Sequence, residues 1–215
     1  MCDTHDHPAG TAGAGHYPSF DECVTFHGHT CPGLAMGYRV AVAAMQALGV
    51  GRPYDEELVA IAETDACGVD AVQMVTGCTA GKGNLVIRDY GKHAFTFLSR
   101  GSGRAVRVLA CATEAPGRAE MDDLRRKVMS GSADGAEHDR FHALMRAAAQ
   151  RILTLPQDEV VRVSEVDMEP PATARIFVSV ACARCGEQVA DAKTRLLDGR
   201  RVCIPCHEAA RPAGN

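Results

Sequence analysis

The stretch CPGLAMGYRVAVAAMQALG, residues 31–49, decides how the first half of the chain folds. Pro32 stands where a first helical residue is favoured, and apolar residues then recur at steps of three and four up to Leu48. The pattern predicts one long helix with an apolar face, which ends at Gly49. Just ahead of it, Ser19 and Glu22 have the spacing of a capping box, so a short helix should begin there.

Helix-like and strand-like runs follow one another through the rest of the chain. We expect helices over 20–27, 71–76, 118–129 and 136–153, and strands over 57–63, 84–89, 94–98, 105–109, 160–166 and 175–180. Short glycine turns separate the three strands between residues 84 and 109, which favours an antiparallel meander. The sequence therefore predicts an α+β fold, with a mixed or antiparallel sheet packed with helices.

Composition and charge narrow the classes of protein to consider. The 215 residues include 23 Lys plus Arg and 27 Asp plus Glu, and this formal charge of −4 argues against a nucleic-acid partner. No apolar run approaches the ~20 residues that cross a bilayer, and the N-terminus lacks the features of a signal peptide, so we expect a cytoplasmic protein without membrane contact. Residues 1–18 predict a flexible arm, 19–168 a core domain and 175–210 a small separate domain.

The small C-terminal domain carries two CxxC pairs, Cys182/Cys185 and Cys203/Cys206. Their separation is typical of a four-thiolate zinc site, and glycine turns between the pairs would return the chain to the metal. We therefore predict a structural four-cysteine zinc finger of the zinc-ribbon or treble-clef kind, with disulfides or redox pairs as the alternative. The finger is locally basic but lacks aromatic residues for base stacking, which favours a solvated face or a protein-docking surface.

A second group of thiols and imidazoles begins with HGHTCPG, residues 27–33. With Pro32 as first helical residue, Cys31 is the N-cap, where backbone N–H groups and the helix dipole stabilise a thiolate. Two more thiols follow in polar surroundings that contain glycine: Cys67 and Cys78. Two others lie in apolar surroundings, which predicts buried small hydrophobes: Cys23 and Cys111. The stretch is therefore either a metal or thiol site or a crowded turn, and the site is favoured.

Four blocks in this order, HGHTCPGLAMGYR (27–39), DACGVDAVQ (65–73), GCTAGKGNL (77–85) and DYGK (89–92), resemble the FmdE family. That family is named for FmdE, one of the subunits of formylmethanofuran dehydrogenase, a molybdenum or tungsten enzyme. The resemblance spans roughly residues 20–166, and the C-terminal finger is similar to one that family members carry. It implies an α+β core, a homodimer, and a cysteine-histidine site that handles a metal or a molybdenum-type cofactor.

The resemblance also implies which residues form that site. Five are candidate ligands of a core-domain metal: His27, His29, Cys31, Cys67 and Cys78. Three ligands with an open position suit catalytic zinc, and thiolate with imidazole suits zinc, copper or nickel more than magnesium. Cys31 and Cys78 are the candidate catalytic thiols. Three polar residues are expected to orient an imidazole or to contact a substrate or cofactor: Asp70, Gln73 and Lys82.

Three functions stay open on the sequence. The first is a metal-binding subunit, accessory protein or stand-alone relative of the molybdenum or tungsten oxidoreductase, with structural zinc, a second metal (zinc or nickel) and a molybdopterin-type cofactor among the expected groups. The second is a metal- or thiol-dependent enzyme that acts on a small molecule, and the third is a regulatory module that docks a protein or nucleic acid through the finger. Spacing places no complete set of nucleophile, base and orienting acid, so binding is favoured over catalysis.

Overall fold

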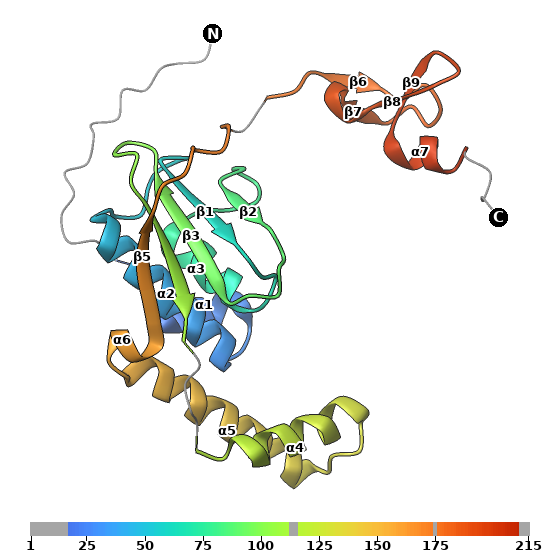
Figure 1. The fold of residues 1–215 in the computed structure, drawn as a ribbon. Coiled ribbons are helices and arrows are strands. Elements are labelled where there is room, and N and C mark those ends of the chain that lie inside the picture. Colours follow the sequence, from blue (N-terminus) through green and yellow to red (C-terminus); the bar gives the residue numbers. More distant parts are fainter. Residues whose placement is uncertain (1–16, 112–115, 174–175, 211–215) are drawn as a thin grey trace. The chain divides into compact units, whose positions relative to one another are not determined.

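The computed structural model describes residues 17–111, 116–173 and 176–210. These residues form two compact units, which divide after Thr173 (Figure 1). The arm predicted over residues 1–18 lies outside the described residues, apart from Tyr17 and Pro18. Within the described ranges, the helices are all too short or too polar to cross a membrane.

The first unit is built on a five-stranded mixed sheet, with the strand order β2-β1-β3-β4-β5. The strands are β1 (Leu58–Ala62), β2 (Leu85–Ile87), β3 (Ala94–Ser99), β4 (Ala105–Ala110) and β5 (Val161–Val166). β1 pairs antiparallel with β3, β3 with β4, and β4 with β5, whereas β2 runs parallel to β1. The predicted α+β class with a mixed sheet is therefore confirmed.

The predicted meander between residues 84 and 109 is wrong in its first strand. β2 does not pair with β3 but lies at the edge of the sheet beside β1, because the helix between β1 and β2 supplies the crossover that a parallel pair needs. Asn84, which is fully buried, fixes the start of β2. Its Nδ2 donates to the carbonyl of Leu58 at 2.9 Å, and its Oδ1 accepts from the backbone N–H of Thr79 at 2.9 Å.

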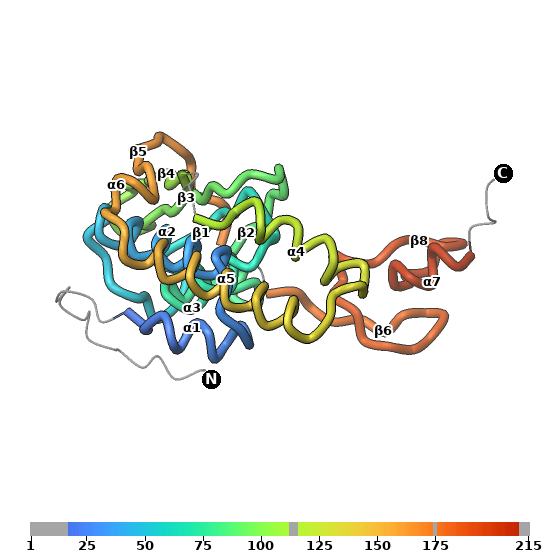
Figure 2. Tube along the Cα trace, turned by 90° about the horizontal axis from the view of Figure 1, so that it is seen from below, coloured from blue at the N-terminus to red at the C-terminus, as the bar shows by residue number. Residues whose placement is uncertain are grey.

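The helices of the first unit are α1 (Phe20–His27), α2 (Pro32–Leu48), α3 (Gly68–Thr76), α4 (Arg118–Ser130), α5 (Gly135–Thr154) and α6 (Gln157–Val160). Both bonds of the predicted capping box at Ser19 are present, and Gly49 ends α2 in the left-handed conformation. α4 and α5 form an antiparallel pair, which Figure 2 shows side by side.

α2 and α3 touch through their backbones. A Cβ atom on Gly37 would lie 2.2 Å from the carbonyl oxygen of Gly68 and 2.4 Å from its Cα, so the helices can pack this closely only with glycine at residue 37. One turn earlier, a Cβ atom on Gly33 would lie 3.3 Å from Cβ of Cys67 and 3.9 Å from Sγ of Cys31. The contact therefore brings together the N-terminal ends of the two helices.

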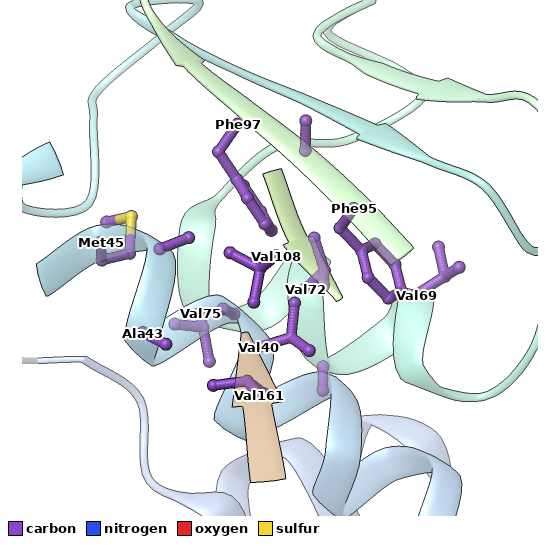
Figure 3. Close-up of a cluster of buried hydrophobic side chains, with 14 of the residues drawn as sticks. Val40, Ala43, Met45, Val69, Val72, Val75, Phe95, Phe97, Val108 and Val161 are labelled. Atoms are coloured by element: carbon purple, nitrogen blue, oxygen red, sulfur yellow. The ribbon is translucent and has the colours of Figure 1, made fainter. Parts of the chain in front are cut away.

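The hydrophobic core lies between these helices and the sheet (Figure 3). Phe95 and Phe97 of β3 stack with ring centroids 6.4 Å apart and point toward side chains of the helices. The helices and the neighbouring strands contribute mainly aliphatic residues, including Val40, Met45, Val72, Val75, Val108 and Val161. This packing fixes where α2 and α3 begin, and so positions the side chains at their ends.

Arg39 of α2 fastens the end of α5. Its Nη1 donates to the carbonyls of Ile152 at 2.7 Å, Leu153 at 3.0 Å and Leu155 at 2.8 Å. These are carbonyls from the last turn of α5 and the residue after it, which have no partner within the helix. One guanidinium thus caps α5 from a neighbouring helix.

The second unit consists of two short hairpins and a terminal helix. Its elements are β6 (Ser179–Ala181), β7 (Gln188–Ala190), a 3₁₀ turn (Asp191–Lys193), β8 (Arg195–Leu197), β9 (Arg200–Val202) and α7 (Ile204–Glu208). β6 pairs antiparallel with β7, and β8 with β9. The predicted strand over 175–180 is wrong in position, because the pairing with β7 begins at Ser179, and Ile176 to Val178 are exposed.

Candidate metal centre

Three potential metal ligands meet where α1 ends and where α2 and α3 begin. His27 ends α1, Cys31 is the N-cap of α2, and Cys67 is the N-cap of α3. One ligand atom from each lies within 4.8 Å of the others. Sγ of Cys31 is 3.9 Å from Nε2 of His27, close to the roughly 3.6 Å that separates sulfur and nitrogen ligands on tetrahedral zinc. The three residues therefore fit a thiophilic metal ion with little movement.

Asp70 and Gln73 of α3 hold His27 in place. Nδ1 of His27 lies 2.7 Å from Oδ2 of Asp70, and Nε2 of Gln73 donates to the other carboxylate oxygen at 3.3 Å. An imidazole whose Nδ1–H donates to a carboxylate presents its Nε2 lone pair on the opposite side. That side faces Cys31. His29 is exposed and stacks on His27 with ring centroids 4.5 Å apart, outside the group of close ligand atoms.

The two cysteines differ in their surroundings. Cys31 is 3% exposed, and this burial raises the pKa of its thiol, while the backbone N–H of Leu34, which donates to Sγ at 3.3 Å, acts in the opposite direction. Cys67 is half-buried beside it. Cys31 therefore keeps its proton at neutral pH until a cation or base takes its place, and metal binding here would release a proton.

A cavity of about 420 Å³ lies next to this group of ligands. It lies between the first turn of α2, the end of β4, and helices α4 and α5, and Gly33 is common to the cavity wall and to the contact with Cys31 and Cys67. Cys111 lines the cavity and is half-buried, so its prediction as a buried hydrophobe is wrong, whereas Cys23 is fully buried as predicted. Cys111 is accessible because it follows the last residue of β4.

The second unit holds a four-cysteine group. Cys182, Cys185, Cys203 and Cys206 each offer a sulfur within 4.8 Å of the others. Sγ of Cys185 and Sγ of Cys203 are 3.9 Å apart, against about 3.8 Å for two sulfurs on tetrahedral zinc. Backbone N–H groups of Cys185 and Cys203 lower the pKa of Cys182 to about 6, which favours the thiolate that zinc requires.

Comparison with known proteins follows the division into two units. Residues 26–162 match the family described as "FmdE, Molybdenum formylmethanofuran dehydrogenase operon". The chain belongs to the FmdE family. Residues 175–211 match the "Prokaryotic dksA/traR C4-type zinc finger". The C-terminal unit of this FmdE-family chain is therefore a zinc finger, and its four cysteines suit a structural zinc ion.

Two similar proteins place the FmdE chain among its relatives. A protein of Archaeoglobus fulgidus described as a "Probable S-adenosyl-L-methionine-binding protein" is 35% identical over 189 residues, which cover 84% of this chain and 50% of that protein. The chain thus spans about half the length of this curated relative. The crystal structure of an FmdE-like protein of tungsten formylmethanofuran dehydrogenase from Syntrophus aciditrophicus has a TM-score of 0.57 at 22% identity, over 93% of this chain and 99% of that one. It shows that the two share a fold.

The structure separates Cys78 from the other predicted ligands of the FmdE core. Cys78 follows the C-terminal end of α3 and Cys67 precedes its N-terminal end, so the nine-residue helix puts them roughly 13 Å apart. Cys78 is fully buried, which raises the pKa of its thiol, and Sγ donates to the carbonyl of Leu58 at 3.3 Å. The two candidate catalytic thiols, Cys31 and Cys78, therefore do not share a site.

Lys82 also lies at the far end of α3. Its Nζ donates to the carbonyl of Asp55 at 3.1 Å, and it lines an open hollow together with Arg52 and Gly77. Lys82 therefore helps to hold the loop before β2 and does not contact the thiols, unlike Asp70 and Gln73, which lie beside them.

Sequence reasoning assigned no role to the cavity or to the backbone contact that builds the centre. The only signal for the contact was the pair Gly33 and Gly37, one helical turn apart, because glycine there permits a close neighbour. Which residue lies opposite was not encoded in the spacing. The cavity depends on how α4 and α5 pack beside α2, and no motif marks it.

Proposed function

We propose that this FmdE-family protein is a metal-handling protein, whose core holds one thiophilic divalent ion, zinc or nickel, on Cys31, Cys67 and His27. The convergence of these three ligand atoms within 4.8 Å carries the proposal. Two sulfurs and one imidazole nitrogen are a donor set that zinc and nickel bind well and magnesium does not.

Three protein ligands leave a coordination position for a small molecule, as in catalytic zinc sites. A metal bound there would supply Lewis acidity to a ligand in that position. The residues of the chain itself prepare the site: Asp70 sets the tautomer and orientation of His27, and Gln73 fixes the carboxylate of Asp70. A carboxylate that contacts a ligating histidine is the usual arrangement around a working metal centre.

We further propose that the protein acts as an accessory or stand-alone relative of the molybdenum or tungsten formylmethanofuran dehydrogenase. The family description and the name of the Syntrophus aciditrophicus protein support this link. A homodimer, a cytoplasmic location and oxidoreductase subunits as partners belong to the same proposal. It requires no pterin cofactor, and the molybdopterin predicted from the resemblance has no ligand set among the residues described above.

A thiol-dependent enzyme is the second candidate, because Asp70, His27 and Cys31 form a chain in the order acid, base and nucleophile. If Cys31 acts as a free nucleophile, its alkylation by iodoacetamide in metal-free protein should be fast at pH 7 and fall on His27→Gln. Slow alkylation that His27→Gln leaves unchanged would contradict this reading.

Metal content per chain tests the proposed function. We expect two metals per chain in protein purified without a His-tag, one after Cys31→Ser/Cys67→Ser, and one after Cys182→Ser/Cys185→Ser. Cys111→Ser is the matched control, since Cys111 lies outside both groups of ligands, and it should keep two. A single metal in the wild type, lost only with the finger pair, would overturn the proposal.

A further inference from the structure

The cavity beside the metal centre combines an apolar interior with a charged rim. Met36 of α2 and Ile152 of α5 line it with aliphatic surface, and Arg118, Asp122 and Arg125 of α4 line it with charge. Its volume of about 420 Å³ falls in the range of small-molecule sites, which usually combine apolar walls with a few polar groups that orient the ligand.

The rim is positive because two guanidinium groups share one carboxylate. Nη1 of Arg125 is 3.0 Å from Oδ1 of Asp122, and Nε of Arg118 is 3.9 Å from Oδ2 of the same residue. The side chains of Arg118 and Arg125 are 67% and 49% exposed, so both keep donors free for an anion. The N-terminal end of α2, which borders the cavity at Pro32 and Gly33, adds a positive helix dipole.

We propose that this cavity binds a small organic anion, a carboxylate or phosphate monoester with an apolar body, as the substrate class of the metal centre. The anionic group lies on Arg118 and Arg125, and the apolar body packs on Met36 and Ile152. Gly33, which has no side chain, lets the bound molecule approach Cys31. The link to the metal rests on the proposed function, whereas the binding of the anion does not.

Matched probes separate charge from shape. Benzoate and phenyl phosphate carry the proposed anion, benzamide has the size of benzoate without the charge, and benzylamine reverses the charge. Calorimetry on the full chain should give tighter binding for the two anions than for benzamide, and none for benzylamine; the stronger anion identifies the head group. Occupancy should also slow alkylation of Cys111 by iodoacetamide, followed on its own peptide by mass spectrometry, because Cys111 lines the cavity.

Two substitutions on one helix form the decisive comparison. Arg125→Gln removes a charge from the rim, whereas Arg126→Gln removes the same charge from the next residue, which pairs with Asp123 and does not line the cavity. We expect about a tenfold loss of benzoate affinity for Arg125→Gln and none for Arg126→Gln. Asp122→Asn should increase affinity, because it frees both guanidinium groups from their carboxylate.

Equal affinity for benzoate and benzamide, or equal effects of Arg125→Gln and Arg126→Gln, would overturn the proposed anion site. Repeating the titration on Cys31→Ser/Cys67→Ser separates the two proposals. Anion binding that does not depend on the core metal would overturn the substrate role and leave the metal site standing. Anion binding by a protein that holds only the finger metal would instead refute the proposed function alone.

Discussion

The two cysteine centres of this chain solve the same chemical problem in opposite ways. The finger takes all four ligands from two CxxC turns between residues 182 and 206, so short hairpins deliver them and no position stays open. The core takes its three from the ends of three helices, between residues 27 and 67, and leaves a position free. A local centre is closed and structural, and a centre assembled by packing can be open and reactive.

The two centres also differ in what holds them together. The buried side chains of the finger are few, Cys182, Val202 and Cys203, so the free energy of metal binding must supply most of its folding. The core centre sits on a packed hydrophobic core that exists without a metal. Losing its metal should therefore leave the core folded.

The largest expected effect comes from removing the finger metal. Cys182→Ser/Cys185→Ser should unfold the second unit, since structural zinc contributes on the order of 10 kcal/mol to such a domain. Proteolysis should then remove the residues after Thr173 while the first unit keeps its melting temperature. A finger that resists protease without its metal would contradict the comparison.

Gly37→Ala should break the core centre through packing alone. Its new Cβ would meet the backbone of Gly68 at 2.2 Å, and neither helix backbone can yield cheaply, so we expect a loss of roughly 3 kcal/mol or more in the unfolding free energy of the core. Gly135→Ala, on α5 with open space around it, is the matched control and should not destabilise. Denaturant titration measures both, and the finger should keep its zinc throughout.

Sequence spacing predicted the finger centre well and the core centre in part, for physical reasons. A CxxC pair fixes two sulfurs within one turn, so four positions along the chain define the site. The core centre depends on which helix faces Gly37, and α3 sets this by tertiary packing. Cys67 and Cys78 look alike along the chain, yet only Cys67 joins the ligands, because the two lie at opposite ends of α3.

The same reasoning explains the errors in the fold. Helices and most strands followed from periodicity and capping residues, as at Ser19 and Gly49. Pairing did not: β2 has the composition of a meander strand, but the crossover through α3 makes it a parallel neighbour of β1. Partner choice in a sheet depends on connections that local patterns do not record.

Asp70→Asn should weaken the core metal and leave the finger metal unchanged. It removes the carboxylate that orients His27, and loss of such a contact usually costs 10- to 100-fold in metal affinity. Competition with a chromophoric chelator measures both sites in one protein, so the finger is an internal reference. Asp65→Asn makes the same charge change at an exposed residue outside the ligand group, and an equal effect there would contradict the role of Asp70.

The smallest effect concerns acid. Arg107 makes two hydrogen bonds to Glu63, at 2.7 and 2.9 Å, and they lower the pKa of that carboxyl. A carboxyl with a lowered pKa stabilises the fold above its unfolded-state pKa of about 4.3, and the contribution disappears as the pH falls below that value. In metal-free protein, where the finger is expected to be unfolded, the core should lose about 1 kcal/mol of stability on this account.

Melting curves at pH 7 and pH 3.5 test this contribution. Glu63→Gln should reduce the difference in core stability between the two pH values. Glu165→Gln, whose partner Arg104 and own side chain are both largely exposed, should leave that difference nearly unchanged. An equal reduction in both variants would show that acid acts on the core through its overall charge.

The cap that Arg39 places on α5 has a mechanical consequence. Because the last turn of α5 is tied to α2, these two walls of the cavity move as one body, and α2 carries Cys31 at its first turn. α4 has no such tether among the described residues; it packs on α5 around the buried side chain of Leu124. Entry to the cavity is therefore a hinge motion of α4, and the metal ligands stay still while the door swings.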